Sequence, residues 1–280
     1  MAVAASPCWW VAGVIARREA RSALRGIGGY VALTLALVAA TWVLLIDLRA
    51  LDAGGLLVLA DPFGSPLAIA MLVLALFLAV SAAVSVARDR ESGTLEVLFY
   101  GPVDEVAYVL GKVGGLLVAW LAALPLLLAS LALLSLMTGL ALTPSILVSL
   151  ALSIVPAAEI VGFAVLLSVG AARVRNAVLL LIGVIALLFG VTLAYGMVLL
   201  VPVSDPSSPV LALRDALAAL DAGVRWVSPF AYLERVVERA MTGAWRSALA
   251  SLVAAGACAI LMIGLAAYVL RHRGVYRRSE

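Results

Sequence analysis

The charged side chains that could do chemistry are concentrated in one stretch, residues 88–112, RDRESGTLEVLFYGPVDEVAYVLGK. Long uncharged runs lie on both sides, and so many charges are too costly to place in hydrocarbon. We therefore expect this stretch in water, between two membrane spans. Its acids are the one group that could serve a lipid-modifying membrane enzyme, although neighbouring arginines neutralise much of their charge. These acids are Asp89, Glu91 and Glu96.

The chain offers little else for catalysis or cofactor binding. Gly111-Lys112 comes closest to a P-loop, but it lacks the upstream glycine and the following hydroxyl residue, so ATP is not expected to bind this chain through a P-loop of its own. His272 is the only histidine and lies in a basic tail, while Cys8 and Cys258 are far apart in the sequence. We expect no catalytic residue, no metal site and no cofactor in this chain.

Glu159 is the one ionisable residue expected deep inside a span. A carboxyl group at that depth costs several kcal/mol unless it is protonated or paired, which makes it a candidate for the translocation path or for a proton relay. The alternative is a structural role, as a protonated carboxyl hydrogen-bonded to a neighbouring helix, for example to a carbonyl freed by Pro156.

The composition indicates a membrane protein. Hydrophobic residues make up 65% of the chain and charged residues 12%, and the mean hydropathy is +1.19, which excludes an ordinary soluble domain. The net charge of +3 is small, and the arginines lie in clusters beside apolar runs. This pattern suits a membrane surface rather than a nucleic acid. The N-terminus has no basic leader before an apolar run, so a cleaved signal peptide is not expected.

We expect a single all-α membrane domain with six transmembrane helices, because a span needs about 20 apolar residues. The run from 113 to 158 has no ionisable residue and is about twice as long as a bilayer core is thick, so it must be a hairpin of two spans. The polar segment 204–246 is expected to form short helices on the outer side. The expected spans are 26–46, 63–87, 108–137, 144–172, 177–203 and 247–270.

Residues 1–25 are expected to form an amphipathic helix in the membrane interface. Tryptophans at its start and arginines at helical spacing are typical of such a helix, although a frayed polar tail would be the simpler alternative. The expected interfacial anchors are Trp9, Trp10, Arg17, Arg21 and Arg25.

The distribution of lysine and arginine predicts that both termini are cytoplasmic. In that orientation thirteen basic residues lie inside and six outside. Five of those six belong to the long segment 204–246, and the tendency of basic residues to stay on the cytoplasmic side is weakest for long segments.

Within the charged stretch, Ser92-Gly93 should break the helix that ends near Arg90. Thr94 is expected to cap a new short helix with Glu96 in its first turn, and Gly101-Pro102 should end it. The short helix carries more apolar surface than a solvated loop needs, which indicates a partner site. Its apolar residues are Leu95, Val97, Leu98 and Phe99.

The order Arg-Glu-x-Gly-Thr-Leu-Glu, a short apolar run, Pro, and then Gly-Lys opening the next span resembles permease subunits of type-2 ATP-binding-cassette (ABC) exporters. In this sequence the motif reads Arg90, Glu91, Gly93, Thr94, Leu95, Glu96, Pro102, Gly111 and Lys112. The resemblance implies that residues 88–107 form the coupling segment, whose helix docks on a separate ATPase. Leu95 with Leu98 or Phe99 would be its apolar anchors, Glu91 and Glu96 would pair with basic groups on the partner, and Lys112 would pair with Glu96 or a lipid phosphate.

The same resemblance implies the partners and the location. They are two copies of a cytoplasmic ABC ATPase that bind ATP and Mg, a second permease subunit that we expect to be identical, and the lipid bilayer of the plasma membrane. The expected function is export, with a drug-like, peptide or lipid-like substrate. Two alternatives stay open: an ion-coupled secondary transporter that uses Glu159, and a lipid-modifying enzyme.

Overall fold

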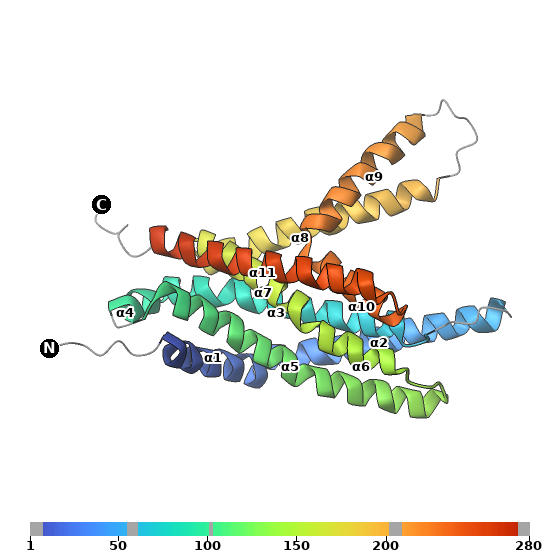
Figure 1. The fold of residues 1–280 in the computed structure, drawn as a ribbon, viewed down its shortest axis with the longest axis horizontal. Coiled ribbons are helices and arrows are strands. Elements are labelled where there is room, and N and C mark those ends of the chain that lie inside the picture. Colours follow the sequence, from blue (N-terminus) through green and yellow to red (C-terminus); the bar gives the residue numbers. More distant parts are fainter. Residues whose placement is uncertain (1–7, 55–60, 101–102, 202–208, 274–280) are drawn as a thin grey trace.

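The computed structural model describes residues 8–54, 61–100, 103–201 and 209–273. The structure is 91% helical, and the described residues contain no strand, so the predicted all-helical class is confirmed. Figure 1 shows the helices as an elongated bundle. In chain order they are α1 (Cys8–Arg25), α2 (Ile27–Gly54), α3 (Gly64–Glu91), α4 (Thr94–Tyr100), α5 (Glu105–Thr138), α6 (Pro144–Leu152), α7 (Ile154–Gly170), α8 (Val174–Leu199), α9 (Pro209–Val227), α10 (Pro229–Met241) and α11 (Trp245–Arg273).

Six helical segments in the described part of the chain are long and apolar enough to cross a membrane: α2, α3, α5, α6 with α7, α8 and α11. They are apolar on every face, as expected for helices solvated by lipid on one side and by other helices on the other. The helices run further than the hydropathy predicts. In particular, α2 continues to Gly54. Asp47 and Arg49, which lie between the first two expected spans, are therefore part of this helix.

The centre of the bundle is formed by α3 and α7, which pack on each other and on most of the remaining helices. Small side chains on α3 such as Ala79, Ala82 and Ala83 are completely buried. Such residues let helix backbones approach closely, which is how membrane helices gain packing energy.

The fourth expected span is two helices joined end to end. α6 and α7 meet at Ser153, three residues before Pro156. Proline has no backbone N–H to donate to the carbonyl four residues earlier, so the regular helix is interrupted at this point. The Ser153 hydroxyl donates to the carbonyl of Leu150 and accepts a hydrogen bond from the Trp120 indole at 3.1 Å.

Helix α1 is a packed part of the bundle and lies along the first half of α5. Glycines on α5 make the close approach possible. A Cβ added at Gly111 would lie 2.7 Å from Cβ of Ile15, and one at Gly115 would lie 2.6 Å from the carbonyl oxygen of Ala16. The expected anchors Trp9, Trp10, Arg17, Arg21 and Arg25 are exposed on the outside of this contact.

Figure 1 places α4 at one end of the bundle, together with α1 and the end of α11, and places α10 toward the other end. We call the first the α4 end. Within the segment expected on the outer side, α9 projects away from the bundle beside α8, while α10 packs against α3, α6, α7 and α11. The buried face of α10 includes Phe230, Leu233 and Val237, and its acids Glu234 and Glu238 are exposed.

Candidate functional site

The turn between α3 and α4 depends on Gly93. α3 ends at Glu91, and Gly93 has a φ of +71°, in the left-handed region that glycine adopts without strain. A Cβ on Gly93 would meet nothing within 4 Å, so the requirement comes from the backbone and not from the lack of space. Thr94 is the first residue of α4, not its cap, and its hydroxyl lies 2.8 Å from that of Ser92. Pro102 lies outside the described residues.

Helix α4 buries a different face from the one that the sequence suggested. Leu95, expected to contact a partner, is only 3% exposed and belongs to the core of the bundle, so that expectation is wrong. Leu98 and Phe99 are half-buried, and the Phe99 ring packs edge-on against Tyr108 at 5.9 Å between centroids. The exposed apolar side chains of α4 are Val97 (72%) and Tyr100 (87%).

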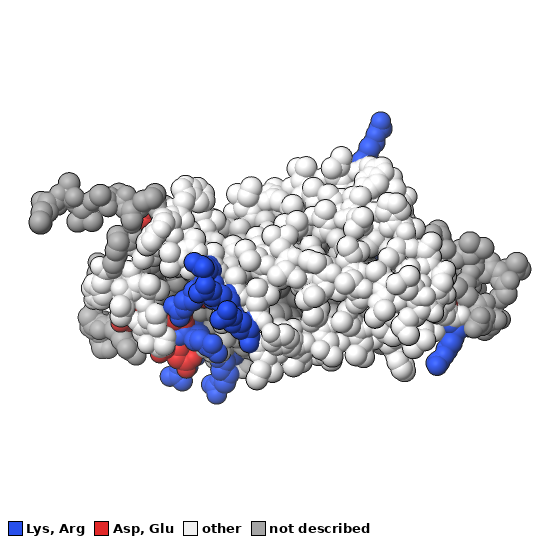
Figure 2. Space-filling view, turned by 90° about the horizontal axis from the view of Figure 1, so that it is seen from below, with Lys and Arg blue, Asp and Glu red and all other residues white. Residues whose placement is uncertain are grey.

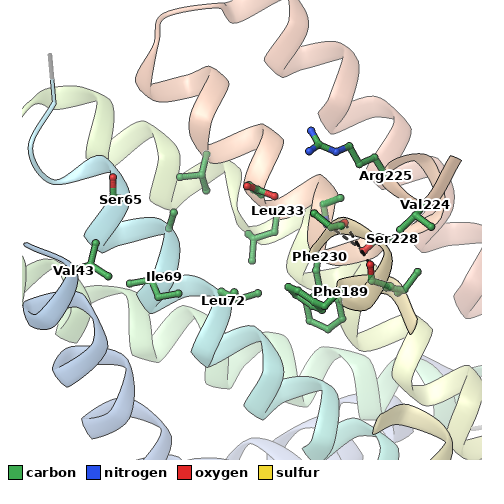
Figure 3. Close-up of a pocket in the computed structure, with 16 residues that line it drawn as sticks. Val43, Ser65, Ile69, Leu72, Phe189, Val224, Arg225, Ser228, Phe230 and Leu233 are labelled. Atoms are coloured by element: carbon green, nitrogen blue, oxygen red, sulfur yellow. Dashed lines mark hydrogen bonds between the residues drawn. The ribbon is translucent and has the colours of Figure 1, made fainter. Parts of the chain in front are cut away.

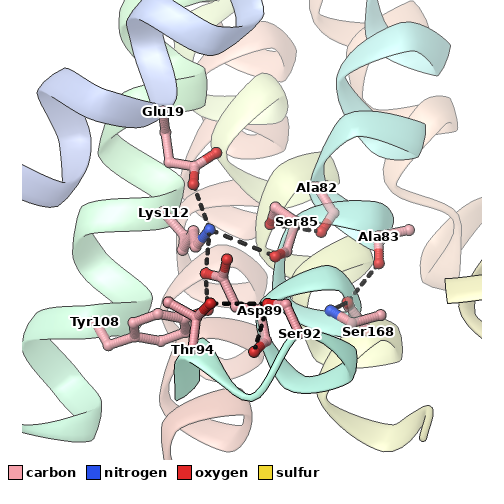
Figure 4. Close-up of polar contacts among 11 residues, drawn as sticks. Glu19, Ala82, Ala83, Ser85, Asp89, Ser92, Thr94, Tyr108, Lys112 and Ser168 are labelled. Carbon is pink, nitrogen blue, oxygen red and sulfur yellow. Dashed lines mark hydrogen bonds and ion pairs between the residues drawn. The ribbon is translucent and has the colours of Figure 1, made fainter. Parts of the chain in front are cut away.

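A buried group of charges, drawn in Figure 4, joins α1, α3 and α5 next to α4. The Lys112 ammonium pairs with the Glu19 carboxylate and lies 2.7 Å from Oδ2 of Asp89. The Tyr108 hydroxyl donates to the same Asp89 oxygen at 2.7 Å, and Lys112 also reaches the carbonyl of Ser85 at 3.4 Å. Lys112 is 2% exposed and Asp89 5%, so these charges satisfy one another away from water. We call Glu19, Asp89, Tyr108 and Lys112 the ion cluster.

Lys112 is expected from the sequence to pair with Glu96 or with a lipid phosphate. This expectation is wrong. The carboxylates that pair with Lys112 come from α1 and α3, and Glu19 is 93 residues away in the sequence. Lys112 is the only lysine of the chain and lies at the head of an apolar helix. A charge in that position requires a buried counter-ion, a signal that could have led to the search for Glu19 and Asp89.

On the opposite side of α3, the charged stretch is joined to the turn between α7 and α8. Nη1 of Arg90 donates to the carbonyls of Val169 at 3.0 Å and Ala171 at 2.8 Å. Oε2 of Glu91 accepts a hydrogen bond from the backbone N–H of Val174 at 3.2 Å, at the N-terminus of α8, where the helix dipole favours an anion.

Residues of the charged stretch 88–112 thus hold five helices together at the α4 end. Asp89, Tyr108 and Lys112 connect α3 and α5 to α1, and Arg90 and Glu91 connect α3 to α7 and α8. This arrangement engages the charged side chains in contacts between helices. It can transmit a displacement of α4 into the spans, because ion pairs and hydrogen bonds resist separation of the helices that they join.

Glu159 lies in the middle of the bundle, 2% exposed, and its Oε2 has no hydrogen-bond partner. That oxygen forms no hydrogen bond to a carbonyl near Pro156.

The surroundings of Glu159 include α10 and α11. Burial raises the pKa of the Tyr232 hydroxyl on α10, and the nearby Cys258 and Glu159 raise it further. The Arg235 guanidinium, which stacks 4.3 Å from the Tyr232 ring centroid, lowers it in part.

A cavity of about 540 Å³ opens between α2, α3, α8, α9 and α10, in the half of the bundle away from α4 (Figure 3). Its walls are mostly apolar and include Ile69, Leu72, Phe189 and Phe230, while Arg225 and Glu234 are the charged residues that line it. The volume is within the range of ligand pockets. Nothing in the local sequence points to this cavity, because its walls come from five helices.

No family model matches the chain, and no curated protein is similar enough to be counted as a relative. The fold itself defines the class, a helical multi-pass membrane protein, because the described ranges contain six helical segments able to cross the bilayer.

Proposed function

We propose that the chain is the permease subunit of an ABC exporter and that α4 couples it to a separate ATPase. The observation that carries this proposal is the position of α4. It is a short helix at the end of the bundle, its inner face is anchored by Leu95, and its outer face presents Val97 and Tyr100. A small apolar patch that charged residues surround is typical of a docking surface.

The contacts behind α4 support a coupling role. A partner that pushes or tilts α4 acts on α3 through a two-residue turn at Ser92 and Gly93. From α3, the ion cluster leads to α1 and α5, and Arg90 and Glu91 lead to α7 and α8. A single docking helix therefore has a route of short polar contacts to the spans around it.

The proposal includes a second permease subunit, which we expect to be a copy of this chain. The spans α2 and α8 support the presence of a second subunit, because both are largely uncovered within one chain. Only 22% of the most apolar stretch of α2 is buried, and only 11% of that of α8. Two such subunits would enclose a path between them, and two ATPases would bind ATP and Mg on the cytoplasmic side.

The decisive experiment replaces the exposed residues of α4. Val97→Asp and Tyr100→Asp should leave the permease folded in the membrane but remove the ATPase that co-purifies with the tagged wild-type protein. Burying one apolar side chain at an interface is worth about 1.5–3 kcal/mol, and burying an unpaired charge costs more, so binding should fall at least tenfold. The same preparation gives the particle mass, which should contain two permease chains.

Two controls make the result specific. Val97→Thr keeps the shape of the side chain and should bind the ATPase nearly normally, and Asp215→Ser on α9 should have no effect. Leu95→Asp is a poor test, since Leu95 is buried and the charge would disturb the attachment of α4 itself. Full ATPase binding and full transport by both Val97→Asp and Tyr100→Asp would show that α4 is not the docking element.

A second candidate, an ion-coupled secondary transporter, is favoured by one observation, the unpartnered Oε2 of buried Glu159. In that case no ATPase should co-purify, and a proton gradient alone should drive uptake into vesicles that contain the purified chain. The third candidate, a lipid-modifying enzyme, is less favoured because Asp89 and Glu91 are engaged in contacts within the fold.

A further inference from the structure

Two cavities lie next to each other where α1 turns into α2. The first has a volume of about 360 Å³ and is lined by α1, α2, α3 and α5; the second, about 80 Å³, is lined by the same four helices. They have three lining residues in common, Ala23, Gly29 and Phe77, so the two spaces are adjacent. The first contains most of the polar groups, and we call it the polar cavity. The second is lined by apolar residues with the Trp120 indole, and we call it the apolar slot.

The polar cavity offers two arginines that the fold does not use. Arg18 on α1 and Arg88 on α3 line it and are exposed, and neither side chain has an ion pair or hydrogen bond within the described part of the chain. The cavity also contains Lys112, Glu19 and Asp89, but these three are paired with one another. Three cationic and two acidic side chains leave one net positive charge, carried by groups that are free to bind an anion.

Other parts of the cavity wall suit the same kind of ligand. The first turn of α2 lines it through Gly28 and Gly29, where the helix dipole favours a negative group. Ser22 and Ser81 line the same space. Figure 2 shows the face of the molecule that is seen from below in Figure 1. Lysine and arginine side chains (blue) gather near one end of that face, while its middle has no charged side chains.

The two cavities follow each other along the helices from the α4 end inward. On α3 the polar cavity uses residues from 77 to 89, whereas the apolar slot uses residues from 74 to 78. On α5 the polar cavity uses Lys112 and Leu116, and the slot begins at Ala119 and reaches Leu126. A molecule that occupied both would place its charged part at the end of the bundle and its apolar part toward the middle.

We propose that this pair of cavities binds an anionic phospholipid. The phosphate would bind between Arg18 and Arg88, because guanidinium groups form charge-assisted hydrogen bonds with phosphate oxygens. The first part of one acyl chain would enter the apolar slot beside Phe77. Basic pockets between membrane helices are a recognised setting for anionic headgroups. The proposal requires only that the chain crosses a membrane, so it holds or fails separately from the proposed transport function.

Lipid rather than free phosphate is the occupant that fits, since a free anion would leave the slot without a role. The site would also place the lipid against the ion cluster, where it would link α1 to α3 through Arg18 and Arg88.

The test is native mass spectrometry of the full-length protein in detergent, with titration of phosphatidylglycerol, of phosphatidylcholine with the same chains, and of inorganic phosphate. Phosphatidylglycerol should bind at least tenfold more tightly than the other two. Arg18→Gln with Arg88→Gln should weaken phosphatidylglycerol binding about 25-fold, from about a factor of five for each arginine near a membrane surface. Ala123→Phe, which fills only the slot, should weaken lipid binding without changing the weak binding of phosphate.

The matched control is Arg17→Gln with Arg21→Gln. At 100° per residue, these arginines are centred about 100° around α1 from Arg18 and Ser22, and they do not line the polar cavity. This pair removes the same charge and should leave phosphatidylglycerol binding within about twofold of the wild type.

Three results would overturn the proposal. One is equal binding of phosphatidylglycerol and phosphatidylcholine by the wild-type protein, a comparison that needs no variant to fold. Another is an equal effect of the two arginine pairs. The third is phosphate binding as tight as lipid binding together with no effect of Ala123→Phe, which would identify a free-phosphate site.

Discussion

Lys112 shows how one buried charge determines the packing around it. Its ammonium is held by Glu19 and Asp89, and Tyr108 donates a hydrogen bond to the same oxygen of Asp89. Removing one partner from such a group leaves the other charges buried without compensation, which is far more costly than never having the group at all. The ion cluster should therefore respond differently to single and to combined substitutions.

We predict that Lys112→Met lowers the free energy of unfolding by about 3–5 kcal/mol, since it leaves buried Asp89 and partly buried Glu19 without their cation. The triple variant Glu19→Gln, Asp89→Asn, Lys112→Met removes all three charges and should recover most of the loss. The measurement is the thermal unfolding midpoint in detergent. A single variant as stable as the wild type would mean that the cluster is hydrated and contributes little.

Glu159 makes the opposite case, a buried carboxyl with an unpartnered oxygen. Replacing such a group with an apolar one of similar size removes a desolvation cost of about 1–3 kcal/mol. Glu159→Leu should therefore unfold at a higher temperature than the wild type, which is the usual signature of a residue kept for function.

If Glu159 belongs to the translocation path, Glu159→Leu and Glu159→Gln should both reduce transport while expression and assembly stay normal. Transport is measured as cellular accumulation of a panel of amphiphilic fluorescent compounds. Normal transport by Glu159→Gln would assign the residue a structural role or none.

At the scale of elements, the junction of α3 and α4 is the position where backbone conformation decides function. Gly93 has φ of +71°, and a non-glycine residue pays about 1–2 kcal/mol to stay there. Because space is open around Gly93, the penalty is purely conformational and a variant can relieve it by tilting α4.

We predict that Gly93→Ala weakens coupling with little loss of global stability, and that Gly93→Val, with a β-branched side chain, does so more strongly. Subunits should stay together more often than in Val97→Asp, but ATP would be hydrolysed with little transport. Gly183→Ala is the control, since Gly183 also has open space around it but lies within α8 with ordinary helical backbone. Equal coupling in Gly93→Val and Gly183→Ala would exclude a role for this turn.

At the scale of the whole molecule, the arrangement of helices gives a topology that can be measured. α1, α4 and the last turns of α11 lie at the same end of the bundle, in keeping with an even number of spans. The excess of arginine at that end predicts that it faces the cytoplasm.

In a variant without Cys8 and Cys258, Asn176→Cys should react with a membrane-impermeant thiol reagent only after cells are permeabilised. Ser207→Cys should react in intact cells, and tags at both termini should be cytoplasmic. Labelling of position 207 from the cytoplasm alone would refute the six-span topology.

The all-helical class, the six apolar segments and the change of direction at Gly93 could be predicted from the sequence. These features depend on local properties, namely the length of an apolar run and the backbone freedom of one glycine. The same is true of the basic, amphipathic character of α1, which follows from residue types at helical spacing.

Only the tertiary structure decided which side of α4 is buried, so that Leu95 faces the core and Val97 and Tyr100 face outward. It also decided that Lys112 pairs with Glu19 and that Arg18 and Arg88 line one cavity with an apolar slot beneath it. The physical reason is that these features depend on contacts between helices far apart in the chain. In so apolar a sequence every helix face is a possible packing face, and only close-packing of the assembled bundle selects among them.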